Sequence, residues 1–249
     1  MEAAPTVYDR ELAPGSFEHE YERMDKLFHP YYSSEYEYHN FDHPRYVAEQ
    51  MRADIAYCEA NGITFNYADR VQLAAFPYTH DAGYHWPVRQ PSSFGSLEHR
   101  SAVHSGVLLR HEGYDPETIV LPLVEGIMVT QLGSSVYANE QGKLYPPHTV
   151  LKRKMYRRTD MSNVGSEDYD FFCAQVRANW LEFQRCKPEQ AGIGLKDFWF
   201  DKAQFVVVTL TLSEDLSYGP WDAEENGNCR YQNNCAKNVE RMNKDLLAA

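Results

Sequence analysis

The spacing of hydrophobic residues along this chain predicts a protein built almost entirely from helices. Apolar side chains recur every three or four residues, which is the period of a helix with one buried face. Phe17, Tyr21, Met24 and Phe28 form the first such set. Similar patterns predict further helices over residues 43–61, 66–80, 96–113, 115–128, 166–180 and 235–246.

Residue types that favour helix ends mark several of these boundaries. Pro44 is expected at the first helical position of the second helix, where its missing N–H leaves no bond unmade. Ser96 and Ser166 are expected as N-caps, because a serine hydroxyl accepts a bond from the free N–H groups of a first turn. Irregular loops are expected over residues 82–95, 133–147 and 213–233.

Residues 198–212 carry a mixed signal. The β-branched run from Val206 to Thr209 favours a strand, but a single strand in a helical chain would have no partner. We therefore expect a buried helix in this segment. Because the 249 residues show no break in composition, the whole chain is predicted to be one all-α domain, a single helical bundle.

The charge of the chain narrows the classes of partner. Asp and Glu total 36 against 24 Lys and Arg, which gives a formal net charge of −12. Binding to duplex nucleic acid requires a positive surface, so we do not expect it. A small anionic substrate is still compatible with this charge if a metal ion and nearby basic residues override the overall field.

Cysteine usage and the lack of long apolar runs indicate a cytoplasmic protein. The N-terminal stretch has neither the basic start nor the apolar core of a signal peptide. An odd number of cysteines without CxxC spacing favours reduced thiols; they are Cys58, Cys173, Cys186, Cys229 and Cys235. The longest apolar run, residues 205–212, falls well short of the ~18 residues of a membrane span, so no membrane association is expected.

The most informative chemistry is the adjacent pair His80-Asp81. Neighbouring side chains in a regular helix point about 100° apart, so both can ligate one ion only at an irregular helix end. Pro77, three residues earlier, supplies such an irregularity. A histidine from the upstream stretch 38–43 and Asp160 downstream would complete a nitrogen and oxygen site for a divalent metal.

These stretches resemble the HD superfamily of metal-dependent phosphohydrolases, and in particular its branch that opens with Tyr-His-Asn-x-x-His. The matching elements are Tyr38-His39-Asn40-Phe41-Asp42-His43, Tyr78-Thr79-His80-Asp81, Glu98-His99-Arg100-Ser101-Ala102 and Thr159-Asp160-Met161-Ser162-Asn163-Val164-Gly165. The third looks like the branch's Glu-Glu-Arg-Ser-Ala, with His99 in place of the second Glu. The resemblance implies a metal core over about residues 38–185, followed by C-terminal helices and a loop over 186–249.

The resemblance implies that His43, His80, Asp81 and Asp160 are the metal ligands. Two imidazoles and two carboxylates suit one divalent transition metal, namely Mn, Fe, Zn, Co or Ni. Such a site leaves positions for water and a substrate oxygen, so that metal-bound water attacks phosphorus. The predicted activity is hydrolysis of a nucleotide or another small phosphate ester.

Two histidines on the following helix keep a second reading open. His99 and His104 are five residues apart and so point about 140° away from each other, which disfavours their binding one ion together, yet they leave room for a second metal. Some proteins of the resembling fold hold two irons and cleave C–C or C–P bonds with O₂. A non-catalytic nucleotide-binding sensor is a third reading. In the hydrolase reading, Glu98 or His99 is the general acid or base.

Basic side chains near Asp160 are candidates for binding the substrate phosphate. Five of the seven residues 152–158 are Lys or Arg. If this segment is helical, Arg153 and Arg157 share a face with Asp160; the alternative is a solvated helix face. Arg100 is a rival phosphate ligand.

Further candidates line the expected pocket. His39 and His104 are candidates to contact the substrate. A second role is expected for His39: it orients one of the ligands Asp81 and Asp160, or it caps its helix. Tyr84 and Trp86, on either side of His85, are candidates to stack on a nucleobase. The apolar C-terminal helix is a candidate surface for a homodimer.

Overall fold

All regular structure in the computed structural model is helical, which confirms the predicted all-α fold. The structure describes residues 17–84 and 96–248, and in these ranges β-type pairing is limited to the isolated bridges Ala138 with Leu144 and Ala223 with Cys229. The helices of the N-terminal part are α1 (Glu18–Phe28), α2 (Asp42–Ala60), α3 (Tyr67–Thr79), α4 (Leu97–His111), α5 (Leu121–Ile127) and α6 (Pro147–Asp160). Those of the C-terminal part are α7 (Tyr169–Cys186), α8 (Leu195–Phe198), α9 (Gln204–Thr211) and α10 (Arg230–Ala248).

Short helical turns join several of these elements. The 3₁₀ turns are η2 (His29–Tyr31), η3 (Ala82–Tyr84), η6 (Met128–Thr130) and η7 (Pro188–Gln190), and the π turns are η5 (Pro116–Val120) and η8 (Trp199–Ala203). The turn η8 links α8 to α9, so residues 198–212 form a helix as predicted. Only one face of α9 is buried, however, because Phe205 is 63% and Val206 is 37% exposed whereas Val207 is buried.

Helix α3 is the centre of the N-terminal part and contacts α1, α2, α4, α5 and α6. Its residues from Val71 to Thr79 are buried on every side, as expected for a helix that is apolar all round. A capping box fixes its start, since Asn66 and Asp69 exchange side-chain to backbone hydrogen bonds. The helix ends at Thr79, so His80 and Asp81 lie at an irregular helix end, as the sequence predicted.

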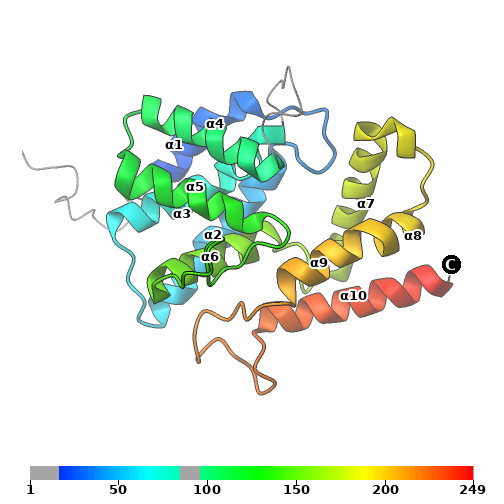
Figure 1. The fold of residues 1–249 in the computed structure, drawn as a ribbon. Coiled ribbons are helices and arrows are strands. Elements are labelled where there is room, and N and C mark those ends of the chain that lie inside the picture. The colour runs from blue at the N-terminus through cyan, green and yellow to red at the C-terminus, as the bar shows by residue number, and fades with distance from the viewer. Residues whose placement is uncertain (1–16, 85–95, 249) are drawn as a thin grey trace, which may run out of the picture.

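The C-terminal helices form an arm beside this body (Figure 1). In Figure 1, α7 stands beside the body, and α9 and α10 run side by side below α7. Helix α10 contacts both α7 and α9, and α9 contacts α6. Cys235, Val239 and Met242 on α10 are buried within the chain, so these apolar side chains pack inside the fold, and the homodimer stays a prediction.

Three predicted helix ends shift in the structure. Helix α7 is capped by Asp168, whose side chain accepts bonds from the N–H groups of Asp170 and Phe171, and not by Ser166. Helix α2 begins at Asp42, so Pro44 is its third residue and not its first. Helix α10 begins at Arg230, several residues before the predicted start.

Helix α6 carries a row of buried basic side chains, which contradicts the alternative of a solvated face. Each of its five Lys and Arg residues is less than 10% exposed. Each also pairs with an acid from another part of the fold: Lys152 with Asp69, Arg153 with Glu125, Lys154 with Asp215, Arg157 with Glu214 and Arg158 with Asp222. Buried charges need such partners because their desolvation is costly.

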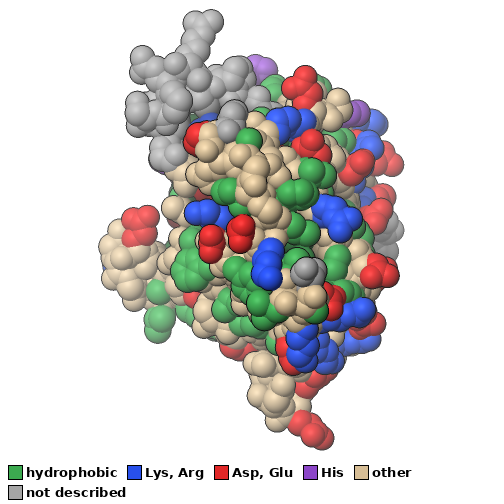
Figure 2. Space-filling view, turned by 90° about the vertical axis from the view of Figure 1, so that its right-hand side faces the viewer, with side chains coloured by type: hydrophobic (Ala, Val, Ile, Leu, Met, Phe, Trp, Pro, Cys, Tyr) green, Lys and Arg blue, Asp and Glu red, His purple; other side chains and the backbone are tan. Residues whose placement is uncertain are grey.

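Charged side chains of both signs are mixed over the face of the arm. Figure 2 shows this face, with Lys and Arg lying among Asp, Glu and hydrophobic side chains and not gathered into one basic patch. No helix in the described residues is both long enough and apolar enough to cross a membrane.

Candidate metal centre

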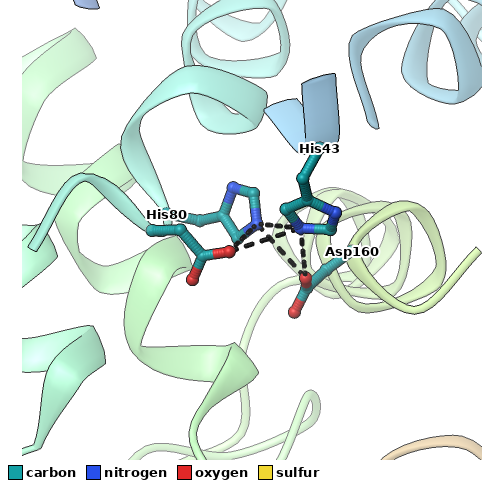
Figure 3. A group of neighbouring side chains, drawn as sticks. His43, His80 and Asp160 are labelled. Atoms are coloured by element: carbon teal, nitrogen blue, oxygen red, sulfur yellow. Dashed lines mark hydrogen bonds and ion pairs between the residues drawn. The ribbon is translucent and has the colours of Figure 1, made fainter. Parts of the chain in front are cut away.

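Four side chains from three helix ends converge on one point (Figure 3). His43 lies in the first turn of α2, His80 and Asp81 follow the last residue of α3, and Asp160 is the last residue of α6. One nitrogen or oxygen atom from each of the four lies within 4.8 Å of the others. The sequence-predicted ligand set is therefore brought together by the fold.

The distances within this group fit a shared ion. Nε2 of His80 lies 3.2 Å from Nε2 of His43, 3.0 Å from Oδ2 of Asp81 and 3.2 Å from Oδ1 of Asp160. Metal bonds of about 2.1 Å place neighbouring ligand atoms roughly 3.0 to 3.4 Å apart. Two imidazole nitrogens and two carboxylate oxygens also suit a divalent transition metal. The residues present therefore fit one such ion.

The helix end selects the nitrogen that His80 offers. Nδ1 of His80 lies 2.9 Å from the carbonyl oxygen of Pro77 and 3.3 Å from that of Phe76. When Nδ1 donates its proton to these carbonyls, the lone pair of Nε2 faces Asp81 and Asp160. The ring of His80 is 1% exposed and stacks on Phe76, which fixes its plane.

The carboxylates of the centre control the charge of its histidines in the metal-free protein. Burial alone would lower the pKa of His80, but Asp81 and Asp160 outweigh it and raise this pKa well above its usual value. The pKa of His43 is raised in the same way, with Asp160 and Asp81 opposing burial. A metal ion would replace the protons that these imidazoles carry.

The two carboxylates are ionised at neutral pH. Burial would raise the pKa of Asp81, but His80 and His39 hold it well below its usual value. Burial is likewise outweighed at Asp160, whose pKa is lowered by His80 and His43. Both aspartates therefore present negative charge to an ion at the centre.

His39 connects the centre to helix α7. Its Nε2 lies 3.9 Å from Oδ2 of Asp81, and its Nδ1 lies 2.5 Å from Oε1 of Glu182. The other Glu182 oxygen accepts bonds of 2.9 Å from the backbone N–H groups of Tyr38 and His39. Of the two roles considered for His39, this placement supports orienting Asp81. Glu182 was not predicted, because nothing in the sequence pairs it with a histidine 143 positions away.

Small residues let neighbouring segments approach the ligands closely. Gly83 donates its backbone N–H to the hydroxyl of Ser101, and a Cβ atom at position 83 would lie 2.5 Å from the Ser101 nitrogen. A Cβ atom at Gly165 would overlap the ring of Tyr231, whose hydroxyl donates to the carbonyl of Met161 at 3.0 Å. These contacts hold the turns that follow Asp81 and Asp160.

A cavity of about 300 Å³ adjoins the centre. Its polar end includes Tyr38, His39, Asp81, Asp160 and Asn163. The rest of the lining consists of Glu98, Thr130, Met161, Val164, Gln175, Val176, Asn179, Phe198, Trp199, Lys202, Ala203, Val206, Val207 and Leu210. The size is at the lower end of the range for ligand sites, and the predicted residue Glu98 faces this space.

The other candidates on α4 lie away from the cavity lining in the described part of the chain. His99 is exposed, since it follows Glu98 and points about 100° away from it. His104 packs edge-on against the ring of Tyr31, with ring centroids 4.9 Å apart, and burial lowers its pKa to about 4. Arg100 is half-buried and does not line the cavity. Of the two residues predicted as acid or base, Glu98 lines the cavity and His99 does not.

The two arginines predicted to bind phosphate are engaged elsewhere, which corrects that prediction. The guanidinium of Arg153 lies over the ring of Tyr145 at 3.6 Å and 3.6 Å from Glu125. Arg157 is 1% exposed and donates to the carbonyl groups of Val129 and Ser134. Neither guanidinium group lines the cavity, because segments packed against α6 supply partners for these buried charges.

The aromatic candidates for base stacking are not tested. The side chain of Tyr84, together with His85 and Trp86, lies outside the described residues.

Comparison with models of protein families, with curated proteins and with solved structures gives no match to this chain.

Proposed function

We propose that the chain is a metal-dependent phosphohydrolase of the HD type that acts on a small phosphate ester. The observation that carries the proposal is the convergence of His43, His80, Asp81 and Asp160 beside a cavity that also receives Glu98. A divalent ion held by these four residues would polarise a phosphoryl oxygen and lower the pKa of a nearby water molecule.

The chain's own residues supply hydrogen bonds to the phosphate. Burial, with Asp160 and Asp81 close by, raises the pKa of Tyr38 well above its usual value, so its hydroxyl keeps a proton to donate. Oδ1 of Asn163 is buried and has no hydrogen-bond partner in the described residues. Because an amide oxygen only accepts hydrogen bonds and is costly to bury unpaired, this group favours water or a hydroxyl donor in the cavity, and Tyr38 is the proposed donor to the phosphate.

Glu98 is proposed as the group that moves the proton. In the reaction, a water oxygen forms a bond to phosphorus while the bond between phosphorus and the leaving oxygen breaks. One proton of the water passes through Glu98 to the leaving oxygen. The products are inorganic phosphate and the free alcohol.

The metal group favours hydrolysis over the two-iron oxygenase reading. Within the described ranges, these four residues are the one group of three or more potential ligands that share a point. His99 and His104 are not part of it, although they are the residues that suggested a second metal. One ion beside a proton-transferring carboxylate is sufficient for ester hydrolysis.

The proposal is tested by phosphate release from protein stripped with a chelator and reloaded separately with Mn, Fe, Co, Ni or Zn. We expect at least one metal to restore release from a phosphate monoester. Glu98→Gln should keep the metal and lower kcat by about 10²- to 10⁴-fold, whereas Glu117→Gln, an exposed change on η5, should have no effect. Wild-type turnover in Glu98→Gln would contradict the role of Glu98, and no turnover with any metal would contradict hydrolysis.

A further inference from the structure

The cavity beside the metal centre is lined by two chemically different sets of side chains. Tyr38 and the ligands Asp81 and Asp160 belong to its polar lining. Its apolar lining comes largely from the arm, through Val176 on α7 and through Phe198, Val206, Val207 and Leu210 on α8 and α9. Figure 1 shows these arm helices standing beside the body that carries the ligands. A ligand that fills the space therefore meets both charged groups and hydrocarbon.

Positive side chains are scarce in this space. Of the described residues that line the cavity, Lys202 on η8 is the one Lys or Arg. Its side chain is exposed. The five basic residues of α6 are paired with acids of their own, so they are not available to a ligand.

The charges around the cavity limit how much negative charge a ligand can carry. Asp81, Glu98 and Asp160 contribute three carboxylates. A divalent ion and Lys202 together balance them, so each phosphate group beyond the one bound at the metal adds negative charge that no cation of the described lining offsets. Enzymes that hold di- or triphosphates surround them with several cations, and an unpaired phosphate in a confined site is repelled.

Resting on the function proposed above, we propose that the substrate is a compact apolar alcohol esterified to a single phosphate group. Its phosphate lies at the metal ligands, and its apolar body packs against Val207 and Leu210, while Lys202 lines the same cavity. Hydrolysis breaks the one ester bond and releases inorganic phosphate with the apolar alcohol. Nucleoside di- and triphosphates bind less well because each further phosphate adds negative charge.

Two pairs of ligands test the apolar wall separately from catalysis. Benzyl phosphate and glycerol phosphate both release an alkyl alcohol, so they differ mainly in the apolarity of the body. We expect kcat/KM for benzyl phosphate to be larger by about tenfold or more. Benzylphosphonate, which has no ester bond, should bind the metal-loaded protein more tightly than methylphosphonate by a similar factor, as measured by calorimetry.

Matched variants locate the effect. Val207→Thr keeps the volume of a wall residue but adds a hydroxyl, and should lower kcat/KM for benzyl phosphate several-fold while leaving glycerol phosphate unchanged. Val208→Thr, the neighbouring position that does not line the cavity, should change neither. Lys202→Gln should raise KM for both esters, and Lys196→Gln, an exposed change on α8, should not.

The outcomes separate this inference from the proposed function. Inhibition of benzyl phosphate hydrolysis should weaken in the order AMP, ADP, ATP. The inference is overturned if ATP inhibits at least as well as AMP, or if glycerol phosphate is hydrolysed as efficiently as benzyl phosphate. If no ester is hydrolysed but benzylphosphonate binds with the expected preference, hydrolysis fails while the ligand class stands. If benzylphosphonate and methylphosphonate bind equally, the ligand class fails.

Discussion

Glu182 holds His39 by its side chain and its backbone at once. Oε1 of Glu182 lies 2.5 Å from Nδ1 of His39, and Oε2 accepts the backbone N–H of the same residue at 2.9 Å. The opposite nitrogen of the imidazole faces Asp81. Glu182 on the arm therefore fixes the orientation of His39, which contacts the metal ligand Asp81 on the body. The same contacts connect the arm to the metal centre.

Replacing Glu182 with Gln should weaken metal binding without unfolding the protein. The amide keeps the size of the side chain but loses the charge that orients His39, and removal of such outer partners costs about 10- to 100-fold in metal affinity. The affinity is measured by competition with a chromophoric chelator. Glu189→Gln, an exposed change on η7 of the same arm, is the control. Equal affinity in Glu182→Gln and wild type would contradict the role of this contact.

Replacing Arg157 with Met should destabilise the fold and leave substrate binding intact. Arg157 is buried, and it bridges the carbonyl groups of Val129 and Ser134 to the carboxylate of Glu214. Removing one partner of a buried ion pair costs about 3–5 kcal/mol, which urea unfolding measures. Arg110→Met, an exposed change on α4, should cost little. Unchanged stability together with a raised KM would return Arg157 to the role of a phosphate ligand.

The metal-free protein should lose stability as the pH rises above neutrality. The pKa values of His43 and His80 are raised by Asp160 and Asp81 against the effect of burial. A raised folded pKa contributes stability that is complete below the unfolded value of about 6.5 and is lost as the pH passes through the folded value. The melting temperature of chelator-treated protein should therefore fall as the pH rises above about 6.5.

Two comparisons check the source of this pH dependence. Metal-loaded protein should not show the fall, because ligation requires neutral imidazoles. Metal-free His80→Gln should show a smaller fall than metal-free wild type, since one of the two titrating groups is gone. A melting temperature that stays flat or rises over this range in metal-free wild type would contradict the account of the centre.

Three of the ligands could be predicted because their signals are local in the sequence, whereas the choice of His43 came from the family resemblance. His80 and Asp81 are adjacent, Pro77 marks the helix end beside them, and Asp160 follows a helical segment at the expected distance. The structure confirms that these residues meet. The apolar period likewise predicted most of the helices. The helix over residues 198–212 was predicted instead because a lone strand would have lacked a partner.

The errors concern partners that are distant in the sequence. The basic residues of α6 looked like a solvated face because their acids lie at positions 69, 125, 214, 215 and 222. The charges of a segment can be counted from the sequence, but whether its side chains are buried depends on which helices pack against that segment. The contact of Glu182 with His39 and the apolar wall of α9 were missed for the same reason, since both arise only when the arm folds against the body.

The central claim is that His43, His80, Asp81 and Asp160 bind one ion together. The most direct test is elemental analysis of purified protein after dialysis against excess divalent metal and removal of loosely bound ions. We predict about one transition-metal ion per chain in the wild type and in Asp197→Ala, an exposed change on α8, and almost none in Asp160→Ala, with circular dichroism showing that all three are folded. A wild type without stoichiometric metal, or an Asp160→Ala variant that retains it, would contradict the claim.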